Sequence, residues 1–357
     1  MTRITIGDKE IGKNRPCFII AEAGVNHNGS LGTAKKLVDA AKHAGADAVK
    51  FQTFKSEDLV TEKTQRARYQ EENIGGSETQ LQMLKKLELS HDDFISLKKY
   101  CDGKGIIFLS TPHTEDAADF LDPMVPAYKI GSGDLTNIPF LKETAKKHKP
   151  MILGTGMSTL EEVKDALRAI YEEGNKDVVM LHCTTNYPCQ RNEVNLRAMQ
   201  TMQKETDCLI GYSDHTLGID VHQMAVRLGA VVIEKHLTLD KNMEGPDHKA
   251  SLEPDEFKEM VTAIKNNNYG NIELDEEVLG SKEKKPTKSE IEIAKLVRKS
   301  IVAARYIRKG EKLSFENLAI KRPGIGLKPS KFLNLVGKKT LRKINKDELI
   351  SLDMLNG

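Results

Sequence analysis

The sequence of 357 residues contains no tryptophan, and aromatic residues make up only 5% of it. Surfaces that bind nucleic acids combine basic residues with aromatic side chains that stack on bases. The scarcity of aromatics and a net charge of only +2 therefore argue against nucleic-acid binding. No apolar run approaches the roughly 20 residues of a membrane-spanning helix. The opening residues MTRITIGDKEIG also lack the basic and then apolar order of a secretory signal. We expect no membrane or nucleic-acid partner.

Cysteine is also scarce, and no CxxC pair occurs. An odd number of widely spaced cysteines does not suit a disulfide framework or a zinc ribbon. Free thiols of this kind are typical of a reduced, cytoplasmic protein. The five cysteines are Cys17, Cys101, Cys183, Cys189 and Cys208.

The low net charge conceals an uneven distribution. Residues 281–357 hold 20 basic and 8 acidic side chains, a net +12, which leaves −10 on residues 1–280. Two solvated surfaces of opposite sign would explain this split. Docking of the basic tail on the acidic body, either its own or that of a partner, would explain it equally.

Eight short apolar runs alternate with helix-period stretches such as 31–45 and 160–174. Continuous apolar runs between helices are typical of parallel strands that are covered by helices. Eight such units in residues 1–280 predict a (β/α)8 TIM barrel. A doubly wound open sheet is the alternative, but no GxGxxG follows the first run. The runs are 17–24, 46–54, 105–111, 127–132, 150–156, 177–185, 208–214 and 231–238.

The remainder of the chain has a different character. Residues 281–292 are charged, contain Pro286 and predict a linker. Residues 293–357 carry an internal repeat displaced by 37 positions, which predicts a small, mostly β module with two similar halves. A module of this size has little core of its own, so we expect it to pack on a larger surface. The repeat pairs Ile307, Lys309, Glu311, Leu313 and Leu318 with Ile344, Lys346, Glu348, Ile350 and Leu355.

Polar residues fall late in the apolar runs or just after them. In a barrel these strand ends surround one mouth, where active sites are built. Lys50 and Lys129 stand inside strand-like runs, where lysine is almost never buried without a partner, so packing alone does not explain them. The polar residues are Glu22, Lys50, Gln52, Thr111, Lys129, Ser132, Thr155, Thr185, Tyr187, Ser213, His215, Glu234 and His236.

His215 and His236 end two successive runs separated by one helical crossover, DVHQMAVRLG. Neutral imidazole is the commonest protein ligand of divalent transition metals. The spacing predicts an open site for Mn²⁺, Zn²⁺, Fe²⁺ or Mg²⁺ that polarises a carbonyl group. The motif GPDH at 245–248 adds Asp247 and His248 nearby. Two satisfied core histidines are the alternative interpretation.

A second group of residues predicts an anion pocket. Lysines bind phosphate as point charges, while hydroxyls and backbone N–H groups complete its coordination. One lysine could instead form a Schiff base, as in metal-free aldolases. Glu22, inside an apolar run, is a candidate general base, and Arg322 is a candidate anchor for a ligand. The pocket would use Lys50, Lys129, Ser132, Thr155 and Ser213.

Taken together, these segments resemble the sialic acid (N-acetylneuraminate) synthases, a family that includes legionaminic and pseudaminic acid synthases. The resemblance implies a TIM barrel followed by an antifreeze-like (SAF) domain. It also implies condensation of phosphoenolpyruvate with an N-acyl amino-hexose to give a nine-carbon α-keto acid and phosphate. The segments are EAGVNHNG (22–29), AVKFQT (48–53), STPH (110–113), AYKIGSGDLTN (127–137), GTGMST (154–159), HCTTNYP (182–188), GYSDHT (211–216), EKHLTLD (234–240), GPDH (245–248) and KRPG (321–324).

The resemblance also implies roles for individual residues. His215 and His236 would hold a divalent metal, Mn²⁺ foremost with Mg²⁺ or Co²⁺ as alternatives, and Glu22 and His236 would be catalytic. Arg322 would reach the sugar across a domain-swapped homodimer. Phosphoenolpyruvate would contact Lys50, Thr111, Lys129, Ser132, Thr185 and Ser213, and the sugar would contact Gln52, Asp134, Tyr187, Asp247 and Arg322.

Three positions depart from the family pattern. Gly154 stands where serine is common, Thr185 where some members have asparagine, and Asp134 where some sialate-forming members have glutamate. The sugar, N-acetylmannosamine or a 6-deoxy-diacetamido hexose, is left open. A reversible pyruvate aldolase and a non-catalytic carbohydrate-binding protein are the alternative functions.

Overall fold

Eight parallel strands form the centre of the protein. The computed structural model describes residues 3–356, apart from the side chains of residues 270 and 271. Each strand coincides with one predicted apolar run, and their order around the sheet is β5-β4-β3-β10-β9-β8-β7-β6. The end strands β5 and β6 lie side by side, although no hydrogen-bonded ladder joins them in the described chain. The strands are β3 (Phe18–Gly24), β4 (Ala48–Thr53), β5 (Ile107–Pro112), β6 (Tyr128–Ile130), β7 (Met151–Gly154), β8 (Val178–His182), β9 (Leu209–Asp214) and β10 (Val232–His236).

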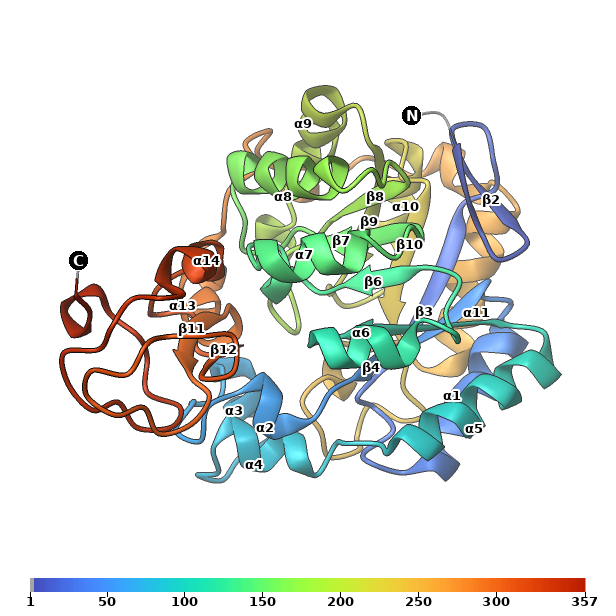
Figure 1. Ribbon diagram of the computed structural model, residues 1–357. Coiled ribbons are helices and arrows are strands. Elements are labelled where there is room, and N and C mark those ends of the chain that lie inside the picture. Colours follow the sequence, from blue (N-terminus) through green and yellow to red (C-terminus); the bar gives the residue numbers. More distant parts are fainter. Residues whose placement is uncertain (1–2, 357) are drawn as a thin grey trace.

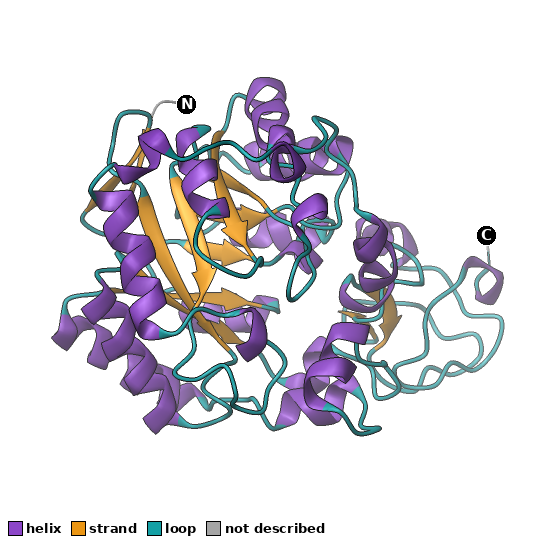
Figure 2. Ribbon diagram, turned by 180° about the vertical axis from the view of Figure 1, so that it is seen from behind, coloured by secondary structure: helices purple, strands orange, loops and turns teal. Residues whose placement is uncertain are grey.

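Helices surround this sheet and cover its outer face (Figure 2). The predicted (β/α)8 barrel is therefore confirmed, and the doubly wound alternative is wrong. The predicted helix at 160–174 is α8, in which Thr159 caps the first turn and Val163, Leu167 and Ile170 pack inward. The outer helices are α1 (Leu31–Ala44), α5 (His91–Lys104), α6 (Glu115–Leu121), α7 (Ile138–Ala145), α8 (Leu160–Glu172), α9 (Arg197–Thr206), α10 (Val221–Arg227) and α11 (Pro254–Lys265).

One end of the barrel is closed by an N-terminal hairpin that the sequence did not predict. Strands β1 (Arg3–Ile6) and β2 (Lys9–Gly12) pair antiparallel. Their Ile4, Ile6 and Ile11 side chains belong to the same buried cluster as the apolar residues inside the barrel. Burial of these side chains closes the amino-terminal end of the strands, which leaves the opposite end for polar residues.

Three short helices lie between β4 and α5, beside the second domain (Figure 1). They are α2 (Ser56–Leu59), α3 (Arg68–Ile74) and α4 (Gln80–Lys85). The chain leaves the barrel through α12 (Glu276–Leu279) and α13 (Lys288–Val297). Since α13 starts at Lys288, the second part of the predicted linker 281–292 is helical. The boundaries 1–280, 281–292 and 293–357 remain predictions.

The second domain has two halves, as the repeat predicted. Ile307 and Ile344 pair across the domain through two backbone hydrogen bonds of 2.9 Å. Glu311 and Glu348 bind the backbone N–H of Arg308 and Asn345 at 2.9 Å in the same way. The regular strands are short, namely β11 (Ser300–Ala303) and β12 (Leu318–Lys321), with helix α14 at Phe332–Leu335. The 3-10 turns of the chain are Ser132–Asp134, Arg191–Glu193, His248–Ala250, Asn268–Asn271, Pro329–Lys331 and Leu352–Met354.

The second domain docks on the barrel of its own chain. Arg298 forms an ion pair with Glu162 at 2.7 Å, and Lys299 forms one with Asp134 at 2.8 Å. Arg322 exchanges backbone hydrogen bonds with Leu59 and Thr61, at 3.0 Å each. The basic tail therefore meets the acidic body, one of the two explanations for the charge split. The contact of Arg322 is made within one chain here, and the domain-swapped homodimer remains a prediction.

Within residues 3–356, no helix combines the length and the apolar character that crossing a membrane requires.

Candidate active site

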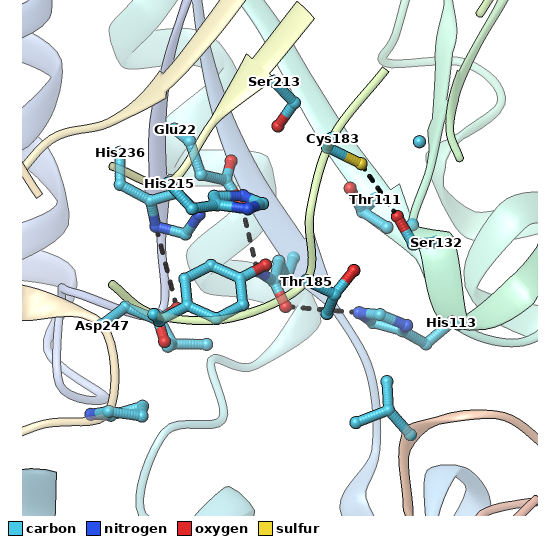
Figure 3. A pocket seen from close by; sticks show the side chains of 18 of the residues that line it. Glu22, Thr111, His113, Ser132, Cys183, Thr185, Ser213, His215, His236 and Asp247 are labelled. Carbon is cyan, nitrogen blue, oxygen red and sulfur yellow. Dashed lines mark hydrogen bonds and ion pairs between the residues drawn. The ribbon is translucent and has the colours of Figure 1, made fainter. Parts of the chain in front are cut away.

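Apart from Thr155 and His248, the residues that the sequence singled out for catalysis, metal or substrate line one pocket at the carboxyl ends of the strands. The cavity has a volume of about 140 Å³. The side chains arrive from different strands and converge on its centre (Figure 3). Parallel strands bring their carboxyl ends to one edge, so short motifs far apart in the sequence build one site.

Two lysines and two glutamates form the floor of this pocket. Lys50 Nζ lies 2.7 Å from Glu22 Oε2 and donates to Thr111 Oγ1 at 3.1 Å. Glu234 Oε1 lies 3.2 Å from Lys129 Nζ and accepts from Ser213 Oγ at 3.0 Å. All of these side chains are buried, so each ammonium has its charge balanced inside the barrel.

The two glutamates differ in acidity because their surroundings differ. Burial raises the pKa of Glu22 above its ordinary value, and the nearby ammonium of Lys50 only partly offsets this effect. Burial also acts to raise the pKa of Glu234, but the charges of Lys129 and Lys50 outweigh it and lower that pKa to about 2. Glu234 is therefore the fixed anion of the cluster, and Glu22 is the carboxyl that can carry a proton.

His215 and His236 face each other above this floor, with ring centroids 5.4 Å apart. Burial lowers the pKa of His215 to about 4, and burial with the neighbouring His215 ring lowers that of His236 well below its ordinary value. Both rings are therefore neutral near pH 7, which is the state that binds metals. The predicted convergence of the two imidazoles with Lys50 and Lys129 is observed.

The donor atoms of this pair fit a metal site that is completed by other ligands. His215 Nδ1 lies 2.7 Å from the carbonyl of Thr184, which only accepts, so Nδ1 carries the proton and Nε2 is left to bind. His236 Nδ1 is buried without a hydrogen-bond partner, and Asp247 Oδ2 lies 3.8 Å away. No group of three or more His, Cys, Asp or Glu within the described chain forms a protein-only cage.

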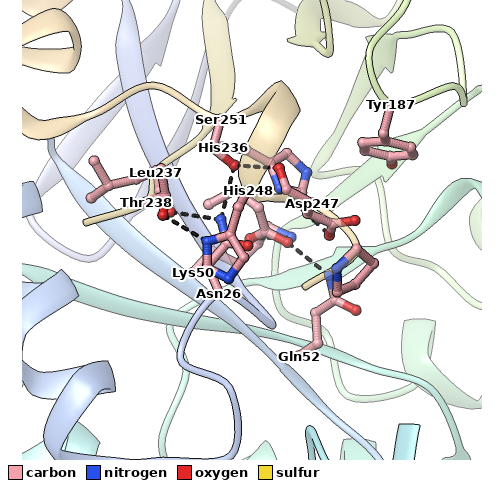
Figure 4. Close-up of polar contacts among 12 residues, drawn as sticks. Asn26, Lys50, Gln52, Tyr187, His236, Leu237, Thr238, Asp247, His248 and Ser251 are labelled. Carbon is pink, nitrogen blue, oxygen red and sulfur yellow. Dashed lines mark hydrogen bonds and ion pairs between the residues drawn. The ribbon is translucent and has the colours of Figure 1, made fainter. Parts of the chain in front are cut away.

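His248, the other histidine of the GPDH motif, does not join this pair. Its Nδ1 lies 2.7 Å from Thr238 Oγ1 (Figure 4). Its Nε2 lies 3.2 Å from Asn28 Oδ1. Both ring nitrogens are therefore occupied by side chains of two different loops. The expectation that His248 adds to the metal cluster is wrong, whereas Asp247 does line the pocket.

Of the hydroxyl groups expected around an anion, some line the pocket and one does not. Ser132, Thr185 and Ser213 line the pocket, and Thr185 Oγ1 is buried without a partner. Thr155 is not among the lining residues, because its hydroxyl donates to the carbonyl of Leu181 at 2.9 Å. The inclusion of Thr155 in the anion pocket is wrong. A Cβ at Gly154 would lie 2.8 Å from Ser132 Oγ, so glycine leaves room for that hydroxyl.

The outer part of the pocket contains the residues expected to contact a sugar. The Tyr187 ring lies 4.2 Å from His215 and 5.0 Å from Tyr69. Arg322 Nη1 donates to Gln80 Oε1 at 3.1 Å. Asp134 lies between Lys299 at 2.8 Å and His113 Nδ1 at 3.5 Å. The side-chain amide of Gln52 extends this series of polar contacts to Glu22. It contacts His113 at 3.3 Å and donates to Glu22 at 3.0 Å.

Asp247 should make stability depend on pH. Burial, reinforced by the negative charge of Glu22, raises the pKa of Asp247 to about 7. The folded protein then holds this proton more tightly than the unfolded chain, so the stabilisation is complete below about pH 4 and is lost as pH rises through 7. Between these limits the unfolding free energy should fall by up to about 1.4 kcal/mol per pH unit.

Denaturant unfolding of metal-free Asp247→Asn between pH 4 and 7 tests this effect. In Asp247→Asn the unfolding free energy should no longer show this fall with pH. In Asp240→Asn, which removes an exposed carboxylate from the same loop, the fall should remain. Equal slopes in wild type and Asp247→Asn would show that Asp247 does not titrate in this way.

Some residues in the pocket or beside it were not assigned a role from the sequence. Glu234 contacts both pocket lysines, and the two-residue spacing to His236 on a strand was the signal that it faces inward. His113 belongs to the STPH motif but gave no separate signal. The contact of Lys299 with Asp134 joins residues 165 positions apart, which local spacing cannot predict.

Comparisons with known proteins agree with the motifs. Residues 37–272 match the NeuB family, and residues 298–356 match the SAF domain. The chain belongs to the NeuB family. N,N'-diacetyllegionaminic acid synthase of Legionella pneumophila is 48% identical over 338 residues, covering 93% of each chain. N-acetylneuraminate-9-phosphate synthase of Homo sapiens is 38% identical, covering 97% of this chain and 94% of that protein.

A solved structure supports the same assignment. The spore coat polysaccharide biosynthesis protein SpsE of Bacillus subtilis superposes with a TM-score of 0.86 at 36% identity, covering 100% of this chain and 99% of that one. The resemblance to the sialic acid synthases and the barrel-plus-SAF architecture are thus confirmed. This NeuB family member is an enzyme of the synthase type that its named relatives represent.

Proposed function

We propose that this enzyme condenses phosphoenolpyruvate with an N-acyl amino-hexose and water to give a nine-carbon α-keto acid and phosphate. The observation that carries the proposal is the shared pocket of two buried lysines and two neutral, facing imidazoles. The lysines suit a small anion of high charge, and the imidazoles suit a metal that activates an aldehyde. The named relatives make acids of this class.

In the proposed reaction, C3 of phosphoenolpyruvate forms a bond to C1 of the open-chain sugar. A divalent metal held by His215 and His236, with Mn²⁺ foremost and Mg²⁺ or Co²⁺ as alternatives, would supply Lewis-acid polarisation of the aldehyde. Lys50 and Lys129, with the hydroxyls of Thr111, Ser132, Thr185 and Ser213, bind the carboxylate and phosphate. Glu22 hands a proton to the new alkoxide, since burial raises its pKa above the ordinary value of a glutamate.

Water then adds to C2, which is electron-poor once the enol electrons have formed the new C–C bond. The C2–O bond to the phosphate group then breaks, the added hydroxyl becomes the ketone oxygen, and its proton leaves with the phosphate. The proton that the water loses on addition restores the acid form of Glu22, so protons balance over the cycle. Gln52, Asp134, Tyr187, Asp247 and Arg322 hold the sugar in the outer pocket. Alignment of two substrates contributes on the order of 7–11 kcal/mol in favourable cases.

We favour a 6-deoxy-diacetamido hexose as the sugar over N-acetylmannosamine. Two diacetyllegionaminic acid synthases are 48% and 46% identical to this chain, against 38% for the human N-acetylneuraminate-9-phosphate synthase. Asp134, one methylene shorter than glutamate and bound to Lys299, leaves more room at the outer pocket. An additional acetamido group in place of a hydroxyl would occupy that room.

A panel of sugars with phosphate release as readout tests the proposal. With phosphoenolpyruvate and Mn²⁺, the diacetamido hexose should give the highest kcat/KM. A pyruvate aldolase would use pyruvate and release no phosphate, and a carbohydrate-binding protein would turn over no sugar. The proposal fails if no N-acyl amino-hexose releases phosphate from protein that binds Mn²⁺.

A further inference from the structure

Glu290 is a buried carboxylate on the helix that joins the two domains, and the reaction outlined above does not use it. It lies in the first turn of α13, with only 1% of its surface exposed. Its Oε2 accepts from the backbone N–H of Thr287 at 2.9 Å and so caps the helix. Capping requires only this one oxygen, so the other is free for a different role.

The second oxygen of Glu290 binds two loops at the mouth of the barrel. Oε1 accepts from the backbone N–H of Met157, after β7, at 2.6 Å and from that of Thr185, after β8, at 2.8 Å. Ionised acceptors form shorter and stronger hydrogen bonds to backbone N–H groups than neutral ones do. One carboxylate thus holds the ends of two adjacent barrel strands.

The bond to Thr185 leads directly to His215. The N–H of Thr185 and the carbonyl of Thr184 belong to the same peptide group, and that carbonyl accepts from His215 Nδ1 at 2.7 Å. A negative charge at the N–H end polarises the peptide, which makes its carbonyl a stronger acceptor. Metal-binding histidines commonly direct their second ring nitrogen to a carboxylate or a carbonyl. Here a carboxylate acts on the imidazole through one peptide group.

The loop that contains Met157 packs tightly against α13. Met157 is fully buried with φ of 59°, a left-handed conformation that a bulky residue adopts only where its surroundings impose it. It packs in one cluster with Ile293 and Val297 of α13. A Cβ at Gly156 would lie 3.2 Å from Glu290 Oε1 and 2.1 Å from Thr185 Oγ1. Glu290 and the two loops are therefore packed without room for a further atom at Gly156.

We propose that Glu290 is a positioning residue for the metal site. It holds His215 in the tautomer protonated at Nδ1, through the Thr184–Thr185 peptide, and leaves Nε2 as the ligand. The inference rests on the proposed metal-dependent function. It means that the helix between the domains also determines the orientation of a ligand inside the barrel.

Titration of the full-length, metal-free protein with Mn²⁺ by calorimetry tests this role. Glu290→Gln, which keeps the size but removes the charge, should raise the Kd for Mn²⁺ by about 10- to 100-fold. Glu256→Gln is the matched control, because Glu256 caps α11 from the same position and accepts from Glu253 N at 2.9 Å. An unchanged Kd in folded Glu290→Gln would overturn the inference. If that variant does not fold, Glu290→Asp replaces it, with the same two outcomes.

A double-mutant cycle separates this route from a general loosening of the loops. A His215→Gln background should bind Mn²⁺ more weakly. In that background Glu290→Gln should leave the weakened Kd unchanged, since the ligand through which Glu290 acts is gone. The same fold-change in both backgrounds would overturn the inference.

A wild type that does not bind Mn²⁺ would reject the proposed function instead. The role of Glu290 is then judged on the metal-free protein, from the ring ¹⁵N shifts of His215. A tautomer protonated at Nδ1 that becomes mixed in Glu290→Gln supports the role, and an unaltered tautomer overturns it.

Discussion

His236→Ala is expected to lower kcat by about a thousandfold or more, while the barrel stays folded. A Lewis acid contributes several kcal/mol to a carbonyl reaction, and each 1.36 kcal/mol corresponds to a factor of about ten. The His236 ring faces that of His215 at 5.4 Å, so its loss removes one of the two proposed protein ligands. His215→Ala should have the same effect, and both variants should lose high-affinity Mn²⁺ binding.

Steady-state phosphate release, circular dichroism and Mn²⁺ titration measure these effects. His182→Ala is the matched control, because His182 is buried at the end of β8 but directs Nε2 to the carbonyl of Val194, outside the pocket. It should retain its activity per folded molecule. Full activity in both His215→Ala and His236→Ala would reject the assignment of these residues as metal ligands.

Lys50→Met is expected to reduce kcat/KM for phosphoenolpyruvate by about a thousandfold and to destabilise the protein. The ammonium lies 2.7 Å from Glu22 and 3.8 Å from Glu234, both buried. Removal of one partner from a buried ion pair leaves uncompensated charge, at a cost of about 3–5 kcal/mol. The substrate anion also loses one of the two lysines proposed to bind it, so activity should fall even in molecules that remain folded.

Urea unfolding and initial rates on the same samples distinguish the two losses. Lys321→Met is the control, since its ion pair with Asp347, at 2.9 Å, is largely buried in the second domain and neither residue lines the pocket. It should cost stability and leave kcat/KM unchanged. A Lys50→Met protein that is folded and fully active would exclude Lys50 from substrate binding.

The barrel could be predicted from the sequence because buried parallel strands are continuous apolar runs. The polar floor followed from the same fact, since Lys50 and Lys129 are conspicuous inside such runs. The pairing of Ile307 with Ile344 followed from a repeat that is visible in the chain. The N-terminal hairpin was not predicted, because two strands of four residues give too short a periodic signal.

Contacts between distant segments could not be predicted. Thr155 directly follows a strand and His248 lies in the loop motif GPDH, but residues outside a strand have no fixed alternation, and both turn to nearby partners. Glu290 resembles an ordinary capping residue, because the sequence TKSE around it reports only the start of a helix. Its bond to Thr185 appears only once the domains are folded together.

Tracing the oxygen atom of water into the products tests the proposed C–O cleavage most directly. When phosphoenolpyruvate and the preferred sugar react in ¹⁸O-enriched water, C–O cleavage predicts one label at C2 of the keto acid and none in the released phosphate. Mass spectrometry of both products, quenched before the ketone exchanges with solvent, gives the answer. Label in the phosphate would mean cleavage of the P–O bond and would contradict the reaction proposed for this pocket.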